Sequence, residues 1–321
     1  MCSLREPLRL ESHNPMIGIP EIYYYDRNNK VVVMQDVGTT LKGSLLAGKI
    51  NSSQAVAIGC ALADFATQLH TWSKTQPQLC QNVSKHHQAT EVYLWAQFSR
   101  LGETINMVSG GILDGYQETF DQAYKLMVSE MRNPVGCGII HGDYRADNIL
   151  VSQNTTNSDT GINRLYVIDW ELSMVAPVFF DIGQLSAEVF YAYHFQKRPE
   201  AIKLLDAFLG AYRGLDSEDT AARCKVAIVF GSCLVVWPIR VGRGTAEEIE
   251  EGVKMGAEYI QKGLQGDVNW LQKSILGELF RESSTQIAVR SARSYLLTCR
   301  EWVYRYLGVL QSVVLSQKIT S

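Results

Sequence analysis

Two short apolar runs near the start of the chain predict a β-hairpin. The runs at 22–25 and 31–34 are aromatic or β-branched, and the residues between them, DRNNK, are typical of a turn. After Gly38 the apolar spacing changes to three or four residues, which predicts helices. The first begins at about Ser52 and Ser53, which can cap it. Two further helices are predicted at about 88–106 and 111–131.

A second β-rich segment follows in the middle of the chain. Residues 148–151 and 164–168 are typical of two short strands, and the polar stretch SQNTTNSDTGIN between them predicts an exposed turn. From about residue 180 onward nearly every segment has a helical pattern. The apolar run at 226–239 is shorter than the ~20 residues of a membrane span and predicts a buried core helix. The pattern therefore predicts an α+β fold.

Composition narrows the classes of function. The chain has 321 residues, a net charge of -3 and 46% hydrophobic residues, and this charge argues against a protein that binds nucleic acid by neutralising phosphates. Its seven cysteines are scattered and never form a CxxC pair, which favours reduced thiols in the cytoplasm. The first residues contain no apolar core of a signal peptide, so we expect no export and no membrane partner.

The polar residues that can carry chemistry lie in two short motifs. Residues 141–148, HGDYRADN, are followed by IDWE at 168–171. Phosphoryl transfer requires a carboxylate that accepts the proton of the attacking hydroxyl, and oxygen ligands for magnesium. Asp143, Asn148 and Asp169 supply such a set. In an extended segment Asp169 and Glu171 would point to the same side, with Trp170 directed into the core.

These motifs resemble the aminoglycoside phosphotransferase and choline kinase superfamily, especially its 5-methylthioribose kinase branch and the related fungal hydroxytryptamine kinases. The resemblance covers roughly residues 4–265. It implies a protein-kinase-like fold of two lobes, with a large, mostly helical C-terminal lobe. It also implies ATP and Mg²⁺ as cofactors and a hydroxyl group of a small metabolite as the acceptor of the γ-phosphate.

The same resemblance assigns roles to particular residues. Asp143 corresponds to the catalytic base, and three residues correspond to magnesium ligands: Asn148, Asp169 and Glu171. His141 and Asp181 would support the catalytic loop by hydrogen bonds. The segment VVMQDVG at 32–38 resembles the family's hinge, which implies adenine recognition at Met34, Gln35 and Val37; a strand that ends in a glycine turn is the alternative for this segment.

The beginning of the chain departs from the family pattern. No glycine-rich phosphate loop and no phosphate-binding lysine are found in the sequence, and Glu6 resembles the glutamate that would hold such a lysine. Lys30 and Lys42 are candidate substitutes, although a surface lysine is the favoured interpretation of each. We therefore expect an incomplete small β lobe, and a catalytically impaired kinase-like protein that acts by binding, or a truncated gene product, is the alternative to an active kinase.

The expected domain division has three parts. Residues 1–38 would form the remnant of the N-terminal lobe and the hinge, 39–285 the helical catalytic lobe, and 286–321 a C-terminal helical extension. Missing strands would leave the hairpin with an unpaired edge, which a homodimer or another partner would cover.

Substrate residues are harder to identify, because small-molecule kinases of this class recognise the substrate with variable helices. Arg145, Trp237 and Arg240 are candidates, with core packing and surface ion pairs as alternatives. Pro238 is expected to bend or end its helix, and His70 is expected to cap one. Sugars, aminoglycosides, choline-like amines and hydroxylated indoles all remain open as substrates.

Overall fold

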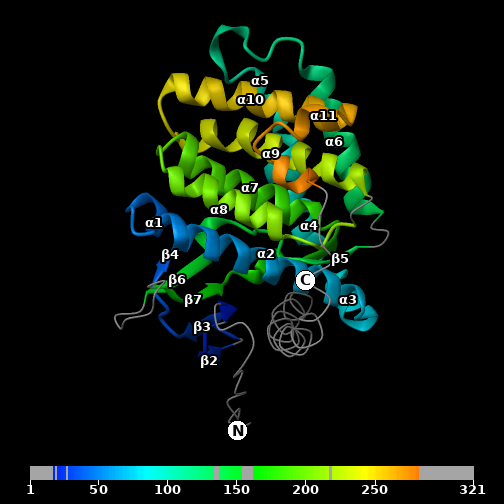
Figure 1. The fold of residues 1–321 in the computed structure, drawn as a ribbon. Helices are drawn as coiled ribbons and strands as arrows, with labels where there is room; N and C mark the ends of the chain where they lie inside the picture. The colour runs from blue at the N-terminus through cyan, green and yellow to red at the C-terminus, as the bar shows by residue number, and fades with distance from the viewer. Residues whose placement is uncertain are drawn as a thin grey trace.

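The computed structural model describes residues 17–281, apart from 19, 27, 134–136, 154–161 and 217–218. Glu6 and the expected extension at 286–321 lie outside the described residues. Figure 1 shows a large helical body with the small sheets on one side of it. The predicted α+β class, with a small β region and a large helical part, is confirmed.

A four-stranded sheet lies beside the long helix α2 (Figure 1). Its order is β1-β7-β6-β4, in which β1 pairs with β7 in parallel and the other neighbours are antiparallel. The pair formed by β6 and β7 confirms the strands predicted in the middle of the chain. The bounds are Ile17–Gly18 for β1, Thr39–Thr40 for β4, Ile149–Gln153 for β6 and Ile162–Val167 for β7.

The predicted hairpin is confirmed as the antiparallel pair β2 (Ile22–Asp26) and β3 (Val31–Met34), with an irregular register near Ile22. Its apolar side chains remain exposed, and Tyr23 and Tyr24 are 61% and 55% exposed. A second two-stranded sheet pairs β5 (Gly138–Ile140) with β8 (Met174–Ala176). These strands are buried and lead directly into and away from the HGD and IDWE motifs.

Helices form most of the described chain. Their bounds are Leu41–Leu46 (α1), Ser52–Lys74 (α2), Pro77–Val83 (α3), His87–Leu94 (α4), Leu101–Ile105 (α5), Gln117–Arg132 (α6), Phe179–His194 (α7), Pro199–Ala211 (α8), Thr220–Val241 (α9), Ala246–Gln265 (α10) and Val268–Leu271 (α11). A π-helical turn at Trp95–Ser99 joins α4 and α5. Short 3₁₀ turns lie at Ser109–Gly111, Ala146–Asn148, Trp170–Leu172 and Gly277–Phe280.

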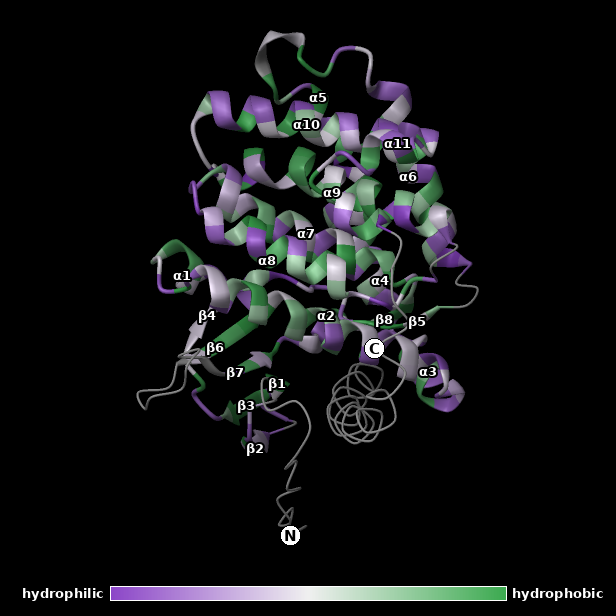
Figure 2. Ribbon diagram, in the orientation of Figure 1, coloured by the Kyte–Doolittle hydropathy of each residue, from purple (hydrophilic) through white to green (hydrophobic). Residues whose placement is uncertain are grey.

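The centre of the core is built from α7 and α9. Almost every residue of α7 is buried, and α7 packs against both α8 and α9. Helix α9 is long and apolar enough to cross a membrane by length and composition, but 72% of its most apolar window is buried. The prediction of a core helix at 226–239 is therefore confirmed. In Figure 2 hydrophilic turns alternate with hydrophobic ones on the more peripheral α10.

Two local expectations were wrong. The cap of α2 is Asn51, whose side chain accepts the N–H of Gln54 in a capping box, and not a serine. Helix α6 begins at Gln117 and not at residue 111. Of the two effects expected of Pro238, it does not end α9, which continues to Val241 and is capped by Gly242 in a left-handed conformation.

Candidate active site

The loop at 141–148 connects β5 to β6 and is held by hydrogen bonds to a residue of α7. Gly142 has φ 80°, and a Cβ at this position would collide with the carbonyl oxygen of Leu172, so only glycine fits. Asp181 in the first turn of α7 accepts the backbone N–H groups of His141 and Gly142 at 2.8 and 3.0 Å. The carboxylate thereby fixes the path of the loop immediately before Asp143.

His70 holds Asp181 from the other side. Its Nε2 lies 3.0 Å from Oδ2 of Asp181, and its Nδ1 lies 2.8 Å from the hydroxyl of Tyr212. His70 and Asp181 are almost fully buried. The expectation that His70 caps a helix was wrong, because its ring lies in the core and links α2 to the loop.

His141 connects the loop to the segment that carries Asp169. Burial lowers the pKa of its imidazole, although Asp181 acts in the opposite direction, and the neutral ring has one donor and one acceptor. The backbone N–H of Asp143 donates to Nδ1 at 3.2 Å, so Nε2 donates to the carbonyl oxygen of Ile168 at 2.9 Å. The ring also packs against Trp170, with centroids 4.5 Å apart.

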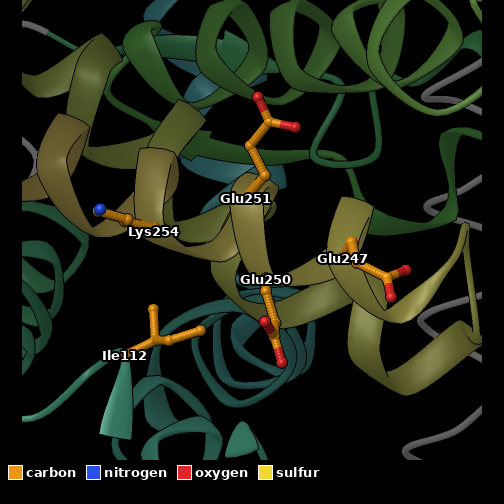
Figure 3. A pocket seen from close by; sticks show the side chains of 5 residues that line it. All are labelled: Ile112, Glu247, Glu250, Glu251 and Lys254. Atoms are coloured by element: carbon orange, nitrogen blue, oxygen red, sulfur yellow. The ribbon is translucent and has the colours of Figure 1, made fainter. Parts of the chain in front are cut away.

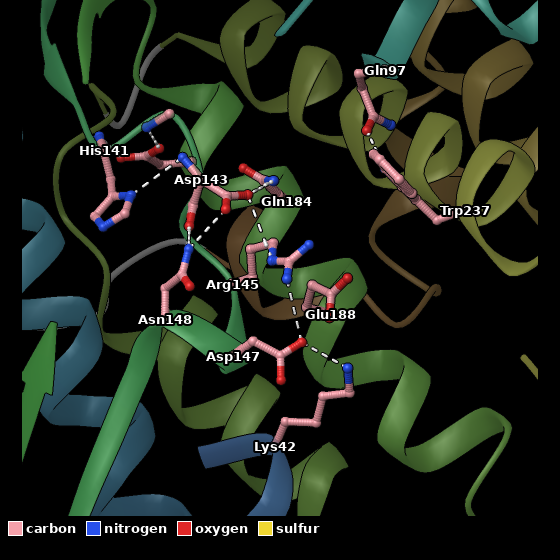
Figure 4. Close-up of polar contacts among 12 residues, drawn as sticks. Lys42, Gln97, His141, Asp143, Arg145, Asp147, Asn148, Gln184, Glu188 and Trp237 are labelled. Carbon is pink, nitrogen blue, oxygen red and sulfur yellow. Dashed lines mark hydrogen bonds and ion pairs between the residues drawn. The ribbon is translucent and has the colours of Figure 1, made fainter. Parts of the chain in front are cut away.

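Side-chain amides hold both oxygens of the Asp143 carboxylate (Figure 4). Asn148 donates from Nδ2 to Oδ2 at 2.8 Å, and Gln184 on α7 donates from Nε2 to Oδ1 at 3.0 Å. Nδ2 of Asn148 also donates to the backbone carbonyl of Asp143 at 2.9 Å. Because both bonds use the amide nitrogen, the amide oxygen of Asn148 is turned away from Asp143. This arrangement can orient a general base and presents an oxygen ligand next to it.

Asp169 and Glu171 are both exposed, but the segment between them is not extended. Asp169 has φ 65° and ψ 59°, in the left-handed region, and Trp170–Leu172 forms a 3₁₀ turn. The expectation of an extended segment was therefore wrong, because a backbone reversal follows β7. Trp170 is directed into the core as expected and is 2% exposed.

The carboxylate of Glu171 is repelled by two other carboxylates, that of Asp169 in its own segment and that of Asp143 in the loop at 141–148. Asp169 raises the pKa of Glu171, and burial and Asp143 add to that effect. Like charges placed together disfavour their ionised forms, and a hard cation with oxygen ligands relieves the repulsion. Within the part of the chain that the structure describes, no three His, Cys, Asp or Glu side chains form a preassembled metal cluster. The oxygen donors available to a magnesium ion at this place are the carboxylates of Asp169 and Glu171 and the amide oxygen of Asn148.

A chain of charges extends from Asp143 toward α1. Nε of Arg145 lies 3.6 Å from Oδ1 of Asp143, and its Nη2 lies 3.4 Å from Oδ2 of Asp147. Lys42 on α1 contacts the same Asp147 oxygen at 2.6 Å. Burial by itself would lower the pKa of Arg145, but Asp143 and other carboxylates, including Glu188, raise it overall. Arg145 thus lies beside Asp143, and Lys42 is paired with Asp147.

Sequence reasoning missed two polar residues on α7, namely Gln184 beside Asp143 and Glu188 beside Arg145 (Figure 4). Burial raises the pKa of Glu188, while Arg243, whose Nη1 lies 3.8 Å away, opposes that effect. The signal that could have revealed them is their spacing of four residues in a largely apolar helix, which places both on one face.

The residues of the predicted hinge lie between β3 and β4. The backbone N–H of Gln35 donates to the carbonyl oxygen of Glu21 at 2.7 Å, and the backbone N–H of Glu21 donates to Oε1 of Gln35 at 3.3 Å. Val37 is buried at 6% exposed, whereas Met34 at the end of β3 is 36% exposed. The segment is thus ordered by its own contacts, and the glycine turn follows at Gly38, with φ 117°.

The remaining substrate candidates have partners inside the helical body. Nε1 of Trp237 donates to Oε1 of Gln97 at 2.7 Å (Figure 4). Arg240 donates to Oγ1 of Thr104 at 2.9 Å and pairs with Glu103 at 3.0 Å. Such contacts also fit the alternatives stated for these residues, namely core packing for Trp237 and an ion pair for Arg240.

A hollow of about 410 Å³ lies elsewhere on the molecule (Figure 3). Its lining consists of an apolar residue and four charged ones, namely Ile112, Glu247, Glu250, Glu251 and Lys254. None of the predicted site residues lines it, and its glutamates lie on α10 and not on the loop at 141–148. The constellation around Asp143 is therefore the better candidate for an active site.

This constellation is that of a phosphotransferase, with a held carboxylate next to a cation-binding set of oxygens. Comparison with known families agrees, because residues 10–222 match the model described as "Phosphotransferase enzyme family". The chain belongs to this family. The predicted membership in a family of small-molecule kinases is thereby confirmed.

Three relatives carry related names. A protein of Psilocybe cyanescens named "4-hydroxytryptamine kinase" is 28% identical over 78% of this chain and 68% of its own length. A protein of the same name from Psilocybe cubensis is 22% identical over 75% of this chain and 66% of its own length. "Phosphotransferase FrzJ" of a Cladobotryum species is 21% identical over 68% of this chain and 58% of its own length. The chain thus spans about three fifths to two thirds of these relatives.

Two solved structures were compared with the chain. One is a choline/ethanolamine kinase family protein from Mesorhizobium loti, with 16% identity, 82% and 77% of the two chains covered and a TM-score of 0.39. The other is the GDP complex of an aminoglycoside 2'-phosphotransferase IIIa variant, with 13% identity, 78% and 76% coverage and a TM-score of 0.37. The family assignment rests on the family model and not on these two structures. Since the named relatives are kinases or phosphotransferases, the alternative of a protein that acts only by binding is not favoured.

Proposed function

We propose that the protein is an ATP- and magnesium-dependent kinase that transfers the γ-phosphate to a hydroxyl group of a small metabolite. The observation that carries the proposal is the Asp143 carboxylate, which is held by Asn148 and Gln184 and is 23% exposed as a side chain. A base must be both oriented and accessible to accept a proton from a substrate hydroxyl. As the new O–P bond forms, this proton passes to Asp143 and the nucleoside diphosphate leaves.

The magnesium ligands in this proposal are the amide oxygen of Asn148 and the carboxylates of Asp169 and Glu171. Magnesium held there would supply positive charge to neutralise the phosphates. The support is the orientation of the Asn148 amide, whose nitrogen faces Asp143 so that its oxygen is turned away, and the negative charge of Asp169 that raises the pKa of Glu171. His141 and Asp181 would act as positioning residues, because their hydrogen bonds fix the loop on both sides of Gly142.

The nucleotide would lie against the hinge. We propose that the backbone between Gln35 and Val37 recognises adenine and that Met34 lines the back of that pocket. Val37 is buried and Gly38 makes the turn that follows, as such a hinge requires.

For the substrate, Arg145 is the candidate that the geometry favours, because its guanidinium lies beside Asp143. Trp237 and Arg240 are proposed as more distant substrate contacts in the same helical lobe. In that role each would bind the ligand in addition to its present partner, Gln97 or Thr104. Two relatives bear the name 4-hydroxytryptamine kinase, so a hydroxylated indole amine is the first compound to test.

The same proposal includes three further points. The domains divide after residues 38 and 285, the protein is located in the reducing cytoplasm, and a partner covers the hairpin. The exposed Tyr23 and Tyr24 support such a partner, and a homodimer is the simplest form. Light scattering of the full chain against a Tyr23→Ser variant tests this point: the homodimer requires that the wild type have twice the mass of a monomer.

The decisive experiment measures transfer of labelled γ-phosphate from ATP to a panel of alcohols: 4-hydroxytryptamine, choline, a pentose and an aminoglycoside. We expect one member to be phosphorylated in the presence of magnesium, and Asp143→Asn to lower the turnover number at least a hundredfold. Glu118→Gln, an exposed site on α6 that touches none of the proposed site residues in the described contacts, serves as the control. Full activity of Asp143→Asn, or no product with any panel member, contradicts the proposal.

A further inference from the structure

Two buried acceptor atoms on α7 lack a hydrogen-bond partner among residues 17–281 as far as these are described. They are Oε1 of Gln184 and Oε2 of Glu188. Each residue is only 8% exposed, and their spacing places them one helical turn apart. Figure 4 shows both next to Arg145, with Gln184 reaching Asp143. Oε2 of Glu188 still has an ion-pair partner in Arg243 at 3.8 Å, whereas Oε1 of Gln184 has no polar partner among the described residues. An unpaired buried acceptor destabilises a fold, so this oxygen beside Asp143 points to a ligand that supplies the donor.

The orientation of the Gln184 amide follows from its neighbour. A carboxylate only accepts hydrogen bonds, so the nitrogen of Gln184 must face Oδ1 of Asp143 and its oxygen must point away. Reversing the amide would bring two acceptors together at 3.0 Å. One side chain therefore presents a donor to the base and, at the same time, an acceptor that the protein does not use.

We propose that Gln184 couples the base to the substrate. Its Nε2 holds Oδ1 of Asp143, and its Oε1 accepts a hydrogen bond from a second O–H or N–H donor of the alcohol that is phosphorylated. This inference rests on the proposed kinase function and deepens it, since it selects alcohols that carry a second donor close to the reacting hydroxyl.

Two variants of similar size separate the two functions of Gln184, namely the donation to Asp143 by Nε2 and the acceptance of a substrate hydrogen bond by Oε1. Gln184→Glu retains oxygen acceptors but loses the N–H that holds Asp143, whereas Gln184→Met loses both. We expect both to lower kcat by about ten- to a hundredfold, which is the loss of one hydrogen bond to a charged group. Only Gln184→Met is expected to raise KM for the panel substrate, by about tenfold.

An analogue of the panel substrate in which the second donor is methylated tests the contact directly. The wild type should lose about tenfold in kcat/KM with this analogue, and Gln184→Met should lose no more than twofold, because the two changes remove the same bond. Ser186→Ala lies on the same helix, and Ser186 bonds only to Ile182 within it, so it controls for general damage to α7.

The outcomes separate the two proposals. Wild-type kcat and KM in both Gln184 variants would overturn the role of Gln184 while Asp143→Asn still abolished turnover. An equal penalty for the methylated analogue in wild type and Gln184→Met would overturn the substrate contact, whatever the effect on kcat. Failure of the wild type with every panel member instead contradicts the kinase proposal, on which this inference depends.

Discussion

Replacing Asp181 by asparagine should destabilise the protein and disorder its catalytic loop together. The carboxylate accepts from three donors: the backbone N–H groups of His141 and Gly142, and Nε2 of His70. Oδ1 serves only Gly142, so the least damaging orientation of the new amide places its nitrogen there. That substitution leaves a buried N–H facing another donor, which costs about 1–3 kcal/mol, and removes a bond to a charged acceptor, worth about 1.5–3 kcal/mol. We expect a total loss of about 2.5–6 kcal/mol.

Urea unfolding followed by circular dichroism measures this change, with the midpoint shifting at constant slope. Asp206→Asn is the matched control, because Asp206 is exposed on α8 and its replacement should change the free energy of unfolding by less than about 0.5 kcal/mol. The turnover number of Asp181→Asn should fall as well, since Asp143 follows the two amides that lose their anchor. A shift below about 1 kcal/mol would refute the reasoning about the buried bonds. Unchanged turnover at full folding would refute the positioning role.

Three further predictions concern other parts of the fold. Gly142→Ala should abolish turnover in the phosphate-transfer assay, because its Cβ would collide with the carbonyl of Leu172; activity above one tenth of wild type would contradict this. Gly231→Ala should lower the free energy of unfolding by about 1–3 kcal/mol in urea, because α9 and α10 touch at Gly231 and Gly256, and an unchanged midpoint would show that the helices can separate freely. Burial raises the pKa of the Cys137 thiol to about 12. At pH 8, iodoacetamide should therefore label Cys137 in the folded protein about a thousandfold more slowly than in the urea-unfolded protein, as measured by mass spectrometry. Equal labelling rates would contradict that shift.

Much of the candidate site was predictable because its residues are neighbours in the sequence. Asp143 and Asn148 are five positions apart, and Asp169 and Glu171 follow the next strand, so a local motif already brings their types together. The prediction failed where backbone geometry was assumed, since the left-handed Asp169 replaces the expected extended segment. The residue at which the backbone leaves the β region of φ and ψ after a strand cannot be predicted from sequence alone, because the packing of the following loop determines that conformation.

Contacts between distant segments were not predictable in the same way. Gln184 lies 41 positions after Asp143, and His70 lies 111 positions before Asp181, yet each pair is in hydrogen-bond contact. A polar residue in an apolar helix indicates only that it needs a partner, and several folds could supply one. The partner becomes known only when the packing of α2 and α7 against the loop is known.

The geometry of the base is set by α7 and not by the small β region. Asp181 in the first turn of α7 fixes the path of the loop, and Gln184 in the same helix fixes the carboxylate that the loop carries. Helix α7 is in turn packed against α8 and α9, and nearly all of its own residues are buried. The position of Asp143 therefore depends on the helical core, whereas the hairpin of β2 and β3 remains exposed on both strands. Changes in the hairpin should affect nucleotide binding and leave the arrangement around Asp143 intact.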